Sequence, residues 1–335
     1  MQLRKLKFMA LKLLADLKTK GKSVEIATDL TSPKLGMYYI LFGSNLSSLN
    51  RLIKGFDENG IPINNAYIDV AGGKPHYYPI SIGQVGLAIF HQYVTHQDPY
   101  RLKEFLRIAD WFVDNKSEDE TMGTYWLTEV PKPEYQVDSP WKSAFTQSRA
   151  LSILLRAWQA TGEPHYLQIA SNALRPFEHD IADGGVAIRR KSEEVFYEEY
   201  VARFPTRVLD GHIFALFGLY DYVRAVDHTE YVSSRELAHR LFDEGISGLI
   251  EALPKFDLGY WVLFNRCQVP GYPKFDPCTI NYLQLVCTQL DILYKITGRN
   301  ELEKYRKKFS NYQRWPNIIK MYIAKFKALK NLNRL

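Results

Sequence analysis

Four segments of the sequence repeat one pattern: a nearly all-apolar helix, a short polar or Gly/Pro turn, and an amphipathic helix. They begin at Ser81, Ser143, Thr206 and Cys278, and the second helix of the third segment begins at Ser233. A helix that is apolar all round must be buried, whereas an amphipathic helix has one face toward solvent. The pattern therefore predicts alternating inner and outer helices. We expect a mainly α fold, an α/α toroid-like incomplete barrel of about four helical hairpins.

A polar residue stands near the start of each apolar helix, at intervals of 63, 63 and 71 residues. These residues are Gln84, Gln147, Asp210 and Asn281. A nearly constant period is the signature of a repeat architecture. Because the inner helices would run in the same direction, we expect their first turns to face one shared cavity. Such a cleft suits long, thin substrates, polysaccharides among them.

In the segments between the hairpins, the spacing of hydrophobic residues changes from the helical period to a shorter one. Residues 123–129, 185–189 and 258–264 read as short strands or extended loops, which we expect over the mouth of the ring. Residues 23–78 are rich in Gly, Asn and Tyr and predict an irregular arm with a few strands.

The basic residues are concentrated in two terminal segments. Residues 1–22 and 301–335 carry formal charges of +6 and +8, which leaves −8 for the residues between them. This distribution does not give the basic field that nucleic-acid binding requires. We divide the chain into a basic helix with an irregular arm (1–78), an α/α catalytic-type domain (79–313) and a basic amphipathic helix (314–335).

The last segment combines an apolar stripe with lysines. The stripe consists of Ile318, Ile319, Tyr322, Ile323, Phe326 and Leu329, and the lysines are Lys320, Lys325, Lys327 and Lys330. A helix of this kind can lie on an anionic membrane, or it can pack against the ring with its lysines in solvent. Both alternatives stay open at this point, as does a homodimer.

The sequence lacks the common motifs of cofactor and metal sites. The three cysteines, Cys267, Cys278 and Cys287, have neither metal-site spacing nor the pattern of a disulfide framework. No nucleotide-binding loop, nucleophile elbow or zinc-protease motif occurs. We therefore expect no cofactor and no metal. Lys12 interrupts the candidate core of a signal peptide, so we expect a cytoplasmic protein, at most peripheral to a membrane.

Two stretches place acids, cations and aromatic residues directly before apolar helices. The first, FYEEYVARFPTRVLDGH (196–212), contains Tyr197, Glu198, Glu199, Tyr200, Arg203, Arg207 and His212. The second, WKSAFTQSR (141–149), contains Trp141, Gln147 and Arg149. Arginine is almost never buried without a partner, so Arg149 on an apolar helix predicts a carboxylate contact in a cavity. The alternative for the first stretch is a polar loop whose Glu–Arg pairs cap the following helix.

These residues resemble the D-glucuronyl C5-epimerase family. The resemblance is carried by YEEYVARFPTRVLDGHIFALFGLYDY from Tyr197, by W-x-S-A-x-x-Q-x-x-A-x-S from Trp141 and by I-N-x-L-Q-L from Ile280. It covers roughly residues 80–312, the family's catalytic α/α domain. It implies conversion of D-glucuronyl to L-iduronyl residues in a heparosan-like or other bacterial glucuronate polymer, without a redox cofactor. The implied partner is an acidic polysaccharide.

The chemistry of this reaction defines what the site needs. The C5 hydrogen lies next to a carboxylate, so its removal requires a base on one face, an acid on the other, and stabilisation of the developing charge. The resemblance implies Glu199 and Tyr200 as an acid/base pair. Two further tyrosines of the family fall on Phe264 and Phe275 in this chain. Two neighbouring tyrosines are candidates to supply the missing hydroxyl: Tyr260 and Tyr272.

The remaining candidates would bind the substrate. They are Trp141, Gln147, Arg149, Tyr197, Glu198, Arg203, Arg207, His212, Gln84 and Asn281. Two other functions stay open. The two phenylalanines favour a non-catalytic polysaccharide-binding relative. An α/α-barrel polysaccharide lyase or glycoside hydrolase is the other, the hydrolase using Glu199 with Asp210 or Asp276 as its paired carboxylates.

Overall fold

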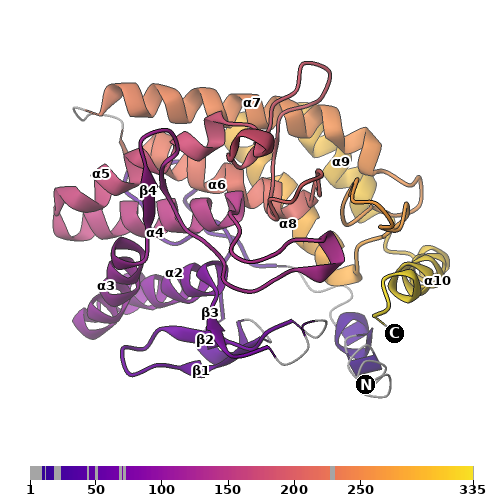
Figure 1. Ribbon diagram of the computed structural model, residues 1–335, viewed down its shortest axis with the longest axis horizontal. Helices are drawn as coiled ribbons and strands as arrows, with labels where there is room; N and C mark the ends of the chain where they lie inside the picture. Colours follow the sequence, from indigo (N-terminus) through magenta and orange to yellow (C-terminus); the bar gives the residue numbers. More distant parts are fainter. Residues whose placement is uncertain are drawn as a thin grey trace.

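Four helical hairpins form the core of the computed structural model (Figure 1). The structure describes residues 10–11, 13–18, 24–43, 45–49, 52–67, 70, 73–226 and 231–334. The hairpins are α2 (Pro79–His96) with α3 (Pro99–Asp114), α4 (Ala144–Thr161) with α5 (Pro164–Asn172), α6 (Leu209–Ala225) with α7 (Val232–Phe256), and α8 (Ile280–Thr297) with α9 (Asn300–Ser310). The predicted mainly α fold is confirmed.

The apolar helices form the interior, as their composition requires. They pack in the succession α2, α4, α6, α8, and each amphipathic helix packs on the inner helix of its own hairpin. Glycine allows the closest of these contacts, because a Cβ atom on Gly218 of α6 would lie 2.5 Å from the Cα atom of Ser148 on α4. The helices do not close into a complete barrel, since α2 and α8 form no contact comparable to those along the succession.

Local signals explain where these helices begin and end. The Asp98 carboxylate accepts a hydrogen bond from the Tyr100 amide at the start of α3, and the Ser143 hydroxyl does the same for the first turn of α4. Helices α4 and α8 end at Gly162 and Gly298, which adopt left-handed φ angles of 78° and 69°. Only glycine takes that conformation without strain.

The strands are short and form three small sheets. In the arm, β1 (Ile53–Phe56), β2 (Pro62–Asn64) and β3 (His76–Tyr77) pair antiparallel in that order. Two hairpins follow, β4 (Ser117–Asp119) with β5 (Gly123–Tyr125) and β6 (Ala187–Ile188) with β7 (Phe196–Tyr197). Residues 258–264, expected as a short strand or an extended loop, form a loop with isolated bridges, such as that between Leu263 and Pro277. Its extended residues pair with other loops and not with a continuous neighbouring strand.

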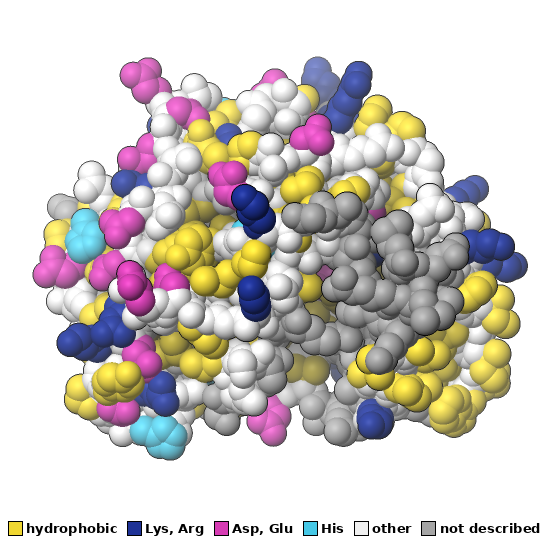
Figure 2. Space-filling view, turned by 60° about the horizontal axis from the view of Figure 1, so that its bottom comes forward, with side chains coloured by type: hydrophobic (Ala, Val, Ile, Leu, Met, Phe, Trp, Pro, Cys, Tyr) yellow, Lys and Arg dark blue, Asp and Glu magenta, His cyan; other side chains and the backbone are white. Residues whose placement is uncertain are grey.

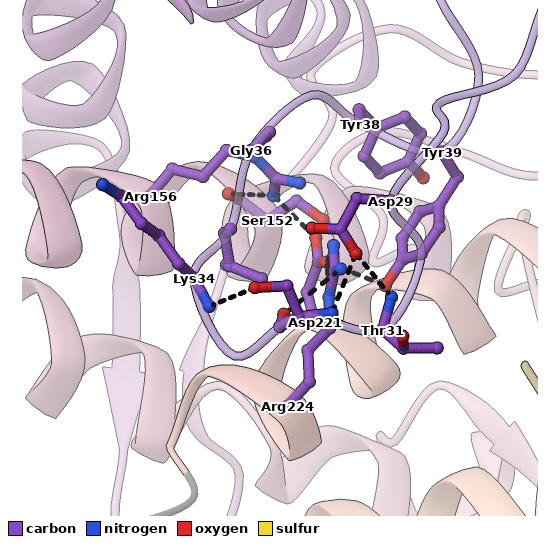
Figure 3. A network of polar contacts seen from close by, with 12 residues as sticks. Asp29, Thr31, Lys34, Gly36, Tyr38, Tyr39, Ser152, Arg156, Asp221 and Arg224 are labelled. Atoms are coloured by element: carbon purple, nitrogen blue, oxygen red, sulfur yellow. Dashed lines mark hydrogen bonds and ion pairs between the residues drawn. The ribbon is translucent and has the colours of Figure 1, made fainter.

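Residues 24–43 of the arm are fastened to α4 and α6 by a buried ionic network (Figure 3). The Asp221 carboxylate accepts hydrogen bonds from Arg156 Nη1 at 2.7 Å, Arg224 Nη2 at 2.9 Å and the Tyr39 hydroxyl at 2.8 Å. Arg156 Nε also donates to the carbonyl oxygen of Gly36. Burial raises the pKa of Asp221, but the two arginines outweigh it and leave this pKa lowered. The carboxylate therefore stays ionised inside the core.

Helix α10 (Trp315–Asn331) packs against the body beside the N-terminal segment (Figure 1). One face of α10 is buried, through Ile318, Met321, Ala328 and Leu329. The Tyr322 hydroxyl donates to Asp16, whose carboxylate also accepts the amides of Ile280 and Asn281 at the start of α8. No described helix is long and apolar enough to cross a membrane.

Candidate active site

Three loops between the helical hairpins meet near the first turns of α4 and α6. They span residues 126–142, 198–208 and 257–279. The Val201 amide donates to the Lys142 carbonyl oxygen, and Gln136 Nε2 donates to the Pro270 carbonyl oxygen at 2.9 Å. A bridge between Val208 and Asn265 joins the second loop to the third. Side chains that are far apart in the sequence are thereby brought together.

Four aromatic rings form a continuous line across these loops. The centroids of Trp141 and Tyr200 are 5.3 Å apart, those of Tyr200 and Tyr135 are 4.9 Å apart, and those of Tyr135 and Tyr272 are 5.4 Å apart. Tyr135 and Tyr272 are stacked with an interplanar angle of 17°. The structure thus places Tyr272, a residue chosen from the sequence, in one group with Trp141 and Tyr200. Tyr135 was not selected by sequence reasoning.

The hydroxyl groups at one end of this line belong to a polar chain. Asn265 Nδ2 donates to the hydroxyl oxygens of Tyr135 and Tyr272 at 2.9 and 2.7 Å. The Tyr272 hydroxyl donates to Asp276 Oδ2 at 2.9 Å, and Lys325 Nζ of α10 donates to Asp276 Oδ1 at 2.6 Å. Helix α10 therefore supplies a cation to the edge of the aromatic line.

Glu199 lies against the first turn of α6. A Cβ atom on Gly211 would come within 2.5 Å of Glu199 Oε2, so this approach depends on the glycine. Burial raises the pKa of Glu199 and the charge of Asp210 raises it further, against a hydrogen bond from Tyr200 and the charge of Lys132. Burial also raises the pKa of Asp210. Two carboxyl groups that disfavour joint ionisation can bind and release a proton near neutral pH.

Lys132 is the buried cation of this group, and sequence reasoning missed it. Its ammonium lies 3.8 Å from the ring centroid of Tyr67 and 5.1 Å from that of Tyr200, and 2.8 Å from Glu134 Oε1. Burial lowers the pKa of Lys132, but the charge of Glu134 outweighs it, so the pKa is raised and the group stays cationic. No local pattern marks Lys132, because the aromatic rings beside it, those of Tyr67 and Tyr200, come from other segments.

The tyrosine hydroxyls nearest Glu199 stay protonated. Burial raises the pKa of Tyr200 well above its ordinary value, and the charge of Glu199 raises it further. Tyr78 behaves in the same way. At neutral pH these groups are therefore neutral hydrogen-bond donors, able to give a proton to a strong base but not to take one.

Glu198 and Arg207 hold the loop that carries Glu199. The Glu198 carboxylate accepts the amides of Thr206 at 2.8 Å and Arg207 at 2.9 Å, while its carbonyl oxygen accepts the Ala144 amide at the start of α4. Arg207 has a left-handed φ of 44° and is ion-paired with Glu193. A non-glycine residue in that region is strained and needs such fixation. We infer that Glu198 and Arg207 position their neighbours, and their expected contact with substrate stays a prediction.

Tyr197, His212 and Gln147 are enclosed by protein partners. The Tyr197 amide donates to His212 Nδ1 at 2.8 Å, so His212 Nε2 carries the proton and donates to the Gly245 carbonyl oxygen. Burial lowers the pKa of His212 to about 4, which keeps it neutral. Gln147 Nε2 donates to the carbonyl oxygens of Thr124 and Ala173. These polar atoms are hydrogen-bonded to other protein groups and not to Glu199.

Arg149 is buried among aromatic rings, not in a cavity with a carboxylate. Its guanidinium carbon lies 4.6 Å from the ring centroid of Phe214 and 4.8 Å from those of Phe145 and Tyr38. Among the described residues, no carboxylate lies within ion-pair distance of it, and its Nε and Nη1 atoms have no hydrogen-bond partner. Within the described residues, π faces surround this cation, and a substrate carboxylate as its partner stays a prediction.

The other sequence-selected residues are spread over the molecule. Tyr260 lies under Lys320 of α10, 3.9 Å from its ammonium, and so outside the aromatic line. Gln84 donates to the Leu49 carbonyl oxygen, and the Asn281 amide is bound by Asp16. Arg203 is exposed and lines a surface cavity of about 300 Å³ together with Trp141 and Lys142.

Comparison with known proteins now places these loops in a family. The model of the D-glucuronyl C5-epimerase C-terminus matches residues 118–311, more than half of the chain. The chain belongs to this epimerase family. A D-glucuronyl C5-epimerase of Caenorhabditis elegans is 26% identical over 210 residues, which are 59% of this chain and 33% of that protein. An uncharacterized protein of Methanocaldococcus jannaschii is 27% identical over 187 residues, 55% of this chain and 56% of that protein.

The epimerase-family region contains the whole of the group around Glu199 except the residues of the arm. Lys132, the aromatic line, Glu199 and Asp210 all lie within residues 118–311. The chain spans a third of the nematode relative and somewhat over half of the archaeal one. The first hairpin and α10 lie outside the matched region, although α10 contributes Lys325 to Asp276.

Replacing Gly211 by alanine is expected to displace Glu199 without unfolding this epimerase-family domain. The added Cβ atom would meet Glu199 Oε2 at 2.5 Å and its Cβ at 2.6 Å, so the side chain must move. Misplacement by about 1 Å can cost about 100-fold in rate. The measurements are the rate of the reaction that the domain catalyses and the midpoint temperature of its thermal unfolding.

The matched control is Gly36→Ala, where an added Cβ atom has nothing within 4 Å. That variant should keep its activity. An active Gly211→Ala variant would contradict the placement of Glu199.

Proposed function

We propose that this protein inverts the C5 centre of D-glucuronyl residues in an acidic polysaccharide. The reaction removes the C5 proton and returns one from the opposite face of the sugar ring. The observation that carries the proposal is the buried Glu199–Asp210 pair beside the cation Lys132, at the N-terminal end of an inner helix. Membership of the epimerase family supports the same reaction class.

Glu199 is suited to exchange a proton with C5. Breaking the C5–H bond leaves its electron pair delocalised into the adjacent carboxylate, so the intermediate is an enediolate. An effective base needs a pKa near the working pH, and burial and Asp210 both move the pKa of Glu199 upward from the ordinary range. The charge of Lys132 can stabilise the enediolate in this water-poor setting.

A tyrosine hydroxyl on the other face would complete the inversion. Tyr272 is the candidate, since it belongs to the aromatic line and stays protonated because burial raises its pKa, whereas the Tyr200 hydroxyl hydrogen-bonds to Glu199 itself. Phe264 lies against Tyr282, and Phe275 is 55% exposed. Neither phenylalanine carries a hydroxyl that could give a proton to C5. The hydroxyl that the resemblance assigns to those phenylalanines is therefore proposed to come from Tyr272.

The surface cavity beside Trp141 is proposed to receive the neighbouring sugars. It is lined by Lys142 and Arg203, two cations that can bind carboxylates along a uronate polymer. Trp141 and Val137 contribute apolar atoms to its wall. Because Trp141 also contacts Tyr200, a chain bound there would lead to the aromatic line.

The test is exchange of the C5 proton. The protein is incubated with heparosan and other glucuronate polymers in deuterated water, and deuterium at C5 and formation of L-iduronyl residues are followed by NMR. We expect both signals to appear together. An unsaturated, ultraviolet-absorbing product would instead indicate a lyase. No incorporation into any uronate polymer would overturn the proposal and favour a polysaccharide-binding protein.

A further inference from the structure

Helix α10 exposes a second apolar face in addition to the one that packs on the body. Trp315, Ile319, Ile323 and Phe326 recur at intervals of four, four and three residues, and each is between 56 and 59% exposed. The buried residues Ile318, Met321, Ala328 and Leu329 already account for the packing of α10. Large side chains exposed as a continuous helical stripe indicate an interaction surface.

The N-terminal segment adds exposed leucines. Leu11 and Leu14 are 57 and 55% exposed, and Asp16 ties their helical segment to Tyr322 of α10. We call Leu11, Leu14, Trp315, Ile319, Ile323 and Phe326 the terminal face. Figure 2 shows exposed hydrophobic side chains, with lysine or arginine side chains beside them, on the side of the molecule where α10 lies in Figure 1.

Lysines border the apolar stripe. Lys320, Lys327 and Lys330 are exposed and lie next to it on the helix surface. Lys325 points the other way and pairs with Asp276. Helix α10 carries four lysines and no acidic residue, so cationic side chains accompany the exposed apolar ones on this helix.

We propose that the terminal face docks on an anionic lipid membrane surface. Aliphatic and aromatic side chains enter the boundary between headgroups and acyl chains, and adjacent lysines attract anionic headgroups. The negative body would be repelled, so the molecule is oriented with its terminal segments toward the lipid. A second copy of the chain fits less well, since a twofold contact would bring the lysines of one α10 close to those of the other.

Helix α10 connects the terminal face to the candidate active site. The inward face of α10 holds Lys325 against Asp276, which accepts the Tyr272 hydroxyl. The aromatic line is therefore anchored to the same helix whose outer face meets the membrane. Docking would keep the site close to the lipid surface.

Co-sedimentation of the full chain with vesicles tests this inference. One set of vesicles is phosphatidylcholine alone and the other contains 30% phosphatidylglycerol. We expect at least tenfold stronger binding to the anionic set, weakened by salt. The variant I319S/I323S/F326S should lose at least tenfold of this binding, and K320Q/K327Q/K330Q should lose the preference for anionic lipid.

The matched control is Y100S/V232S, which removes two exposed apolar side chains outside the terminal face. It should bind like the unchanged protein, and circular dichroism checks the fold of every variant. Equal binding to both vesicle sets, or binding unaffected by I319S/I323S/F326S, would overturn the inference. The inference would also be overturned by a dimer in analytical ultracentrifugation that I319S/I323S/F326S dissociates. That result would assign the terminal face to a second copy of the chain.

Discussion

Glu199→Gln is expected to lower the rate of deuterium incorporation at C5 of a glucuronate polymer by at least about 100-fold. Glutamine keeps the size and hydrogen-bonding capacity of the side chain, so it fits against Gly211, but it cannot carry the proton. The rate is measured by NMR at saturating polymer, and far-ultraviolet circular dichroism checks the fold.

The same substitution should change the pH dependence of stability. Because the pKa of Glu199 is raised in the folded protein, the native state binds more protons than the unfolded state above the ordinary carboxyl range. Stability therefore falls as pH rises through the folded pKa. Glutamine does not ionise, so its stability does not fall in this way. The free energy of unfolding of the variant, minus that of the unchanged protein, should therefore be larger at pH 9 than at pH 5.

Glu251→Gln is the control for both effects, because this carboxylate lies in an exposed pair with Lys255 on α7. It should leave activity and the pH profile of unfolding unchanged. A Glu199→Gln protein that still exchanges deuterium within threefold of the unchanged chain would refute the role of Glu199.

Asp221→Ala is expected to destabilise the protein by about 3–5 kcal/mol, the usual cost of breaking a buried ion pair. The substitution leaves Arg156 and Arg224 buried without their carboxylate and removes the acceptor of the Tyr39 hydroxyl. The arm at residues 24–43 should separate from α4 and α6 at lower denaturant concentration. Urea unfolding followed by tryptophan fluorescence measures the loss.

The control substitution is Asp243→Ala, which removes an exposed carboxylate paired with His239 on α7. Its effect should stay within about 0.5 kcal/mol, as for most surface changes. A loss below about 1 kcal/mol for Asp221→Ala would mean that the network in Figure 3 does not hold the arm.

The hairpins and one part of the candidate site could be predicted from the sequence because their signals are local. Apolar runs that end at Gly162 and Gly298 determine helix boundaries within a few residues. Glu199 and Tyr200 stand out because adjacent acidic and aromatic residues directly precede a buried helix. Their neighbours in the same stretch were harder to assign, since Glu198 and His212 are just as polar but are bound inside the protein.

Arg149 illustrates how the surroundings of a buried charge depend on packing. A buried arginine does need compensation, but the rings of Phe145, Phe214 and Tyr38 surround it in place of a carboxylate. Phe145 and Phe214 belong to different helices, and Tyr38 belongs to the arm. No spacing within one segment could have indicated that enclosure.

By itself, the sequence determined the helical hairpins, the burial of their apolar members and the proximity of Glu199 to the start of α6, because these depend on periodicity and on neighbours along the chain. Only the tertiary structure decided that Lys132, Tyr135 and Tyr272 join Glu199, and that Lys325 of α10 reaches Asp276. These contacts join loops and a terminal helix separated by tens to more than a hundred residues. Their pairing depends on how the hairpins pack, which is a property of the whole core.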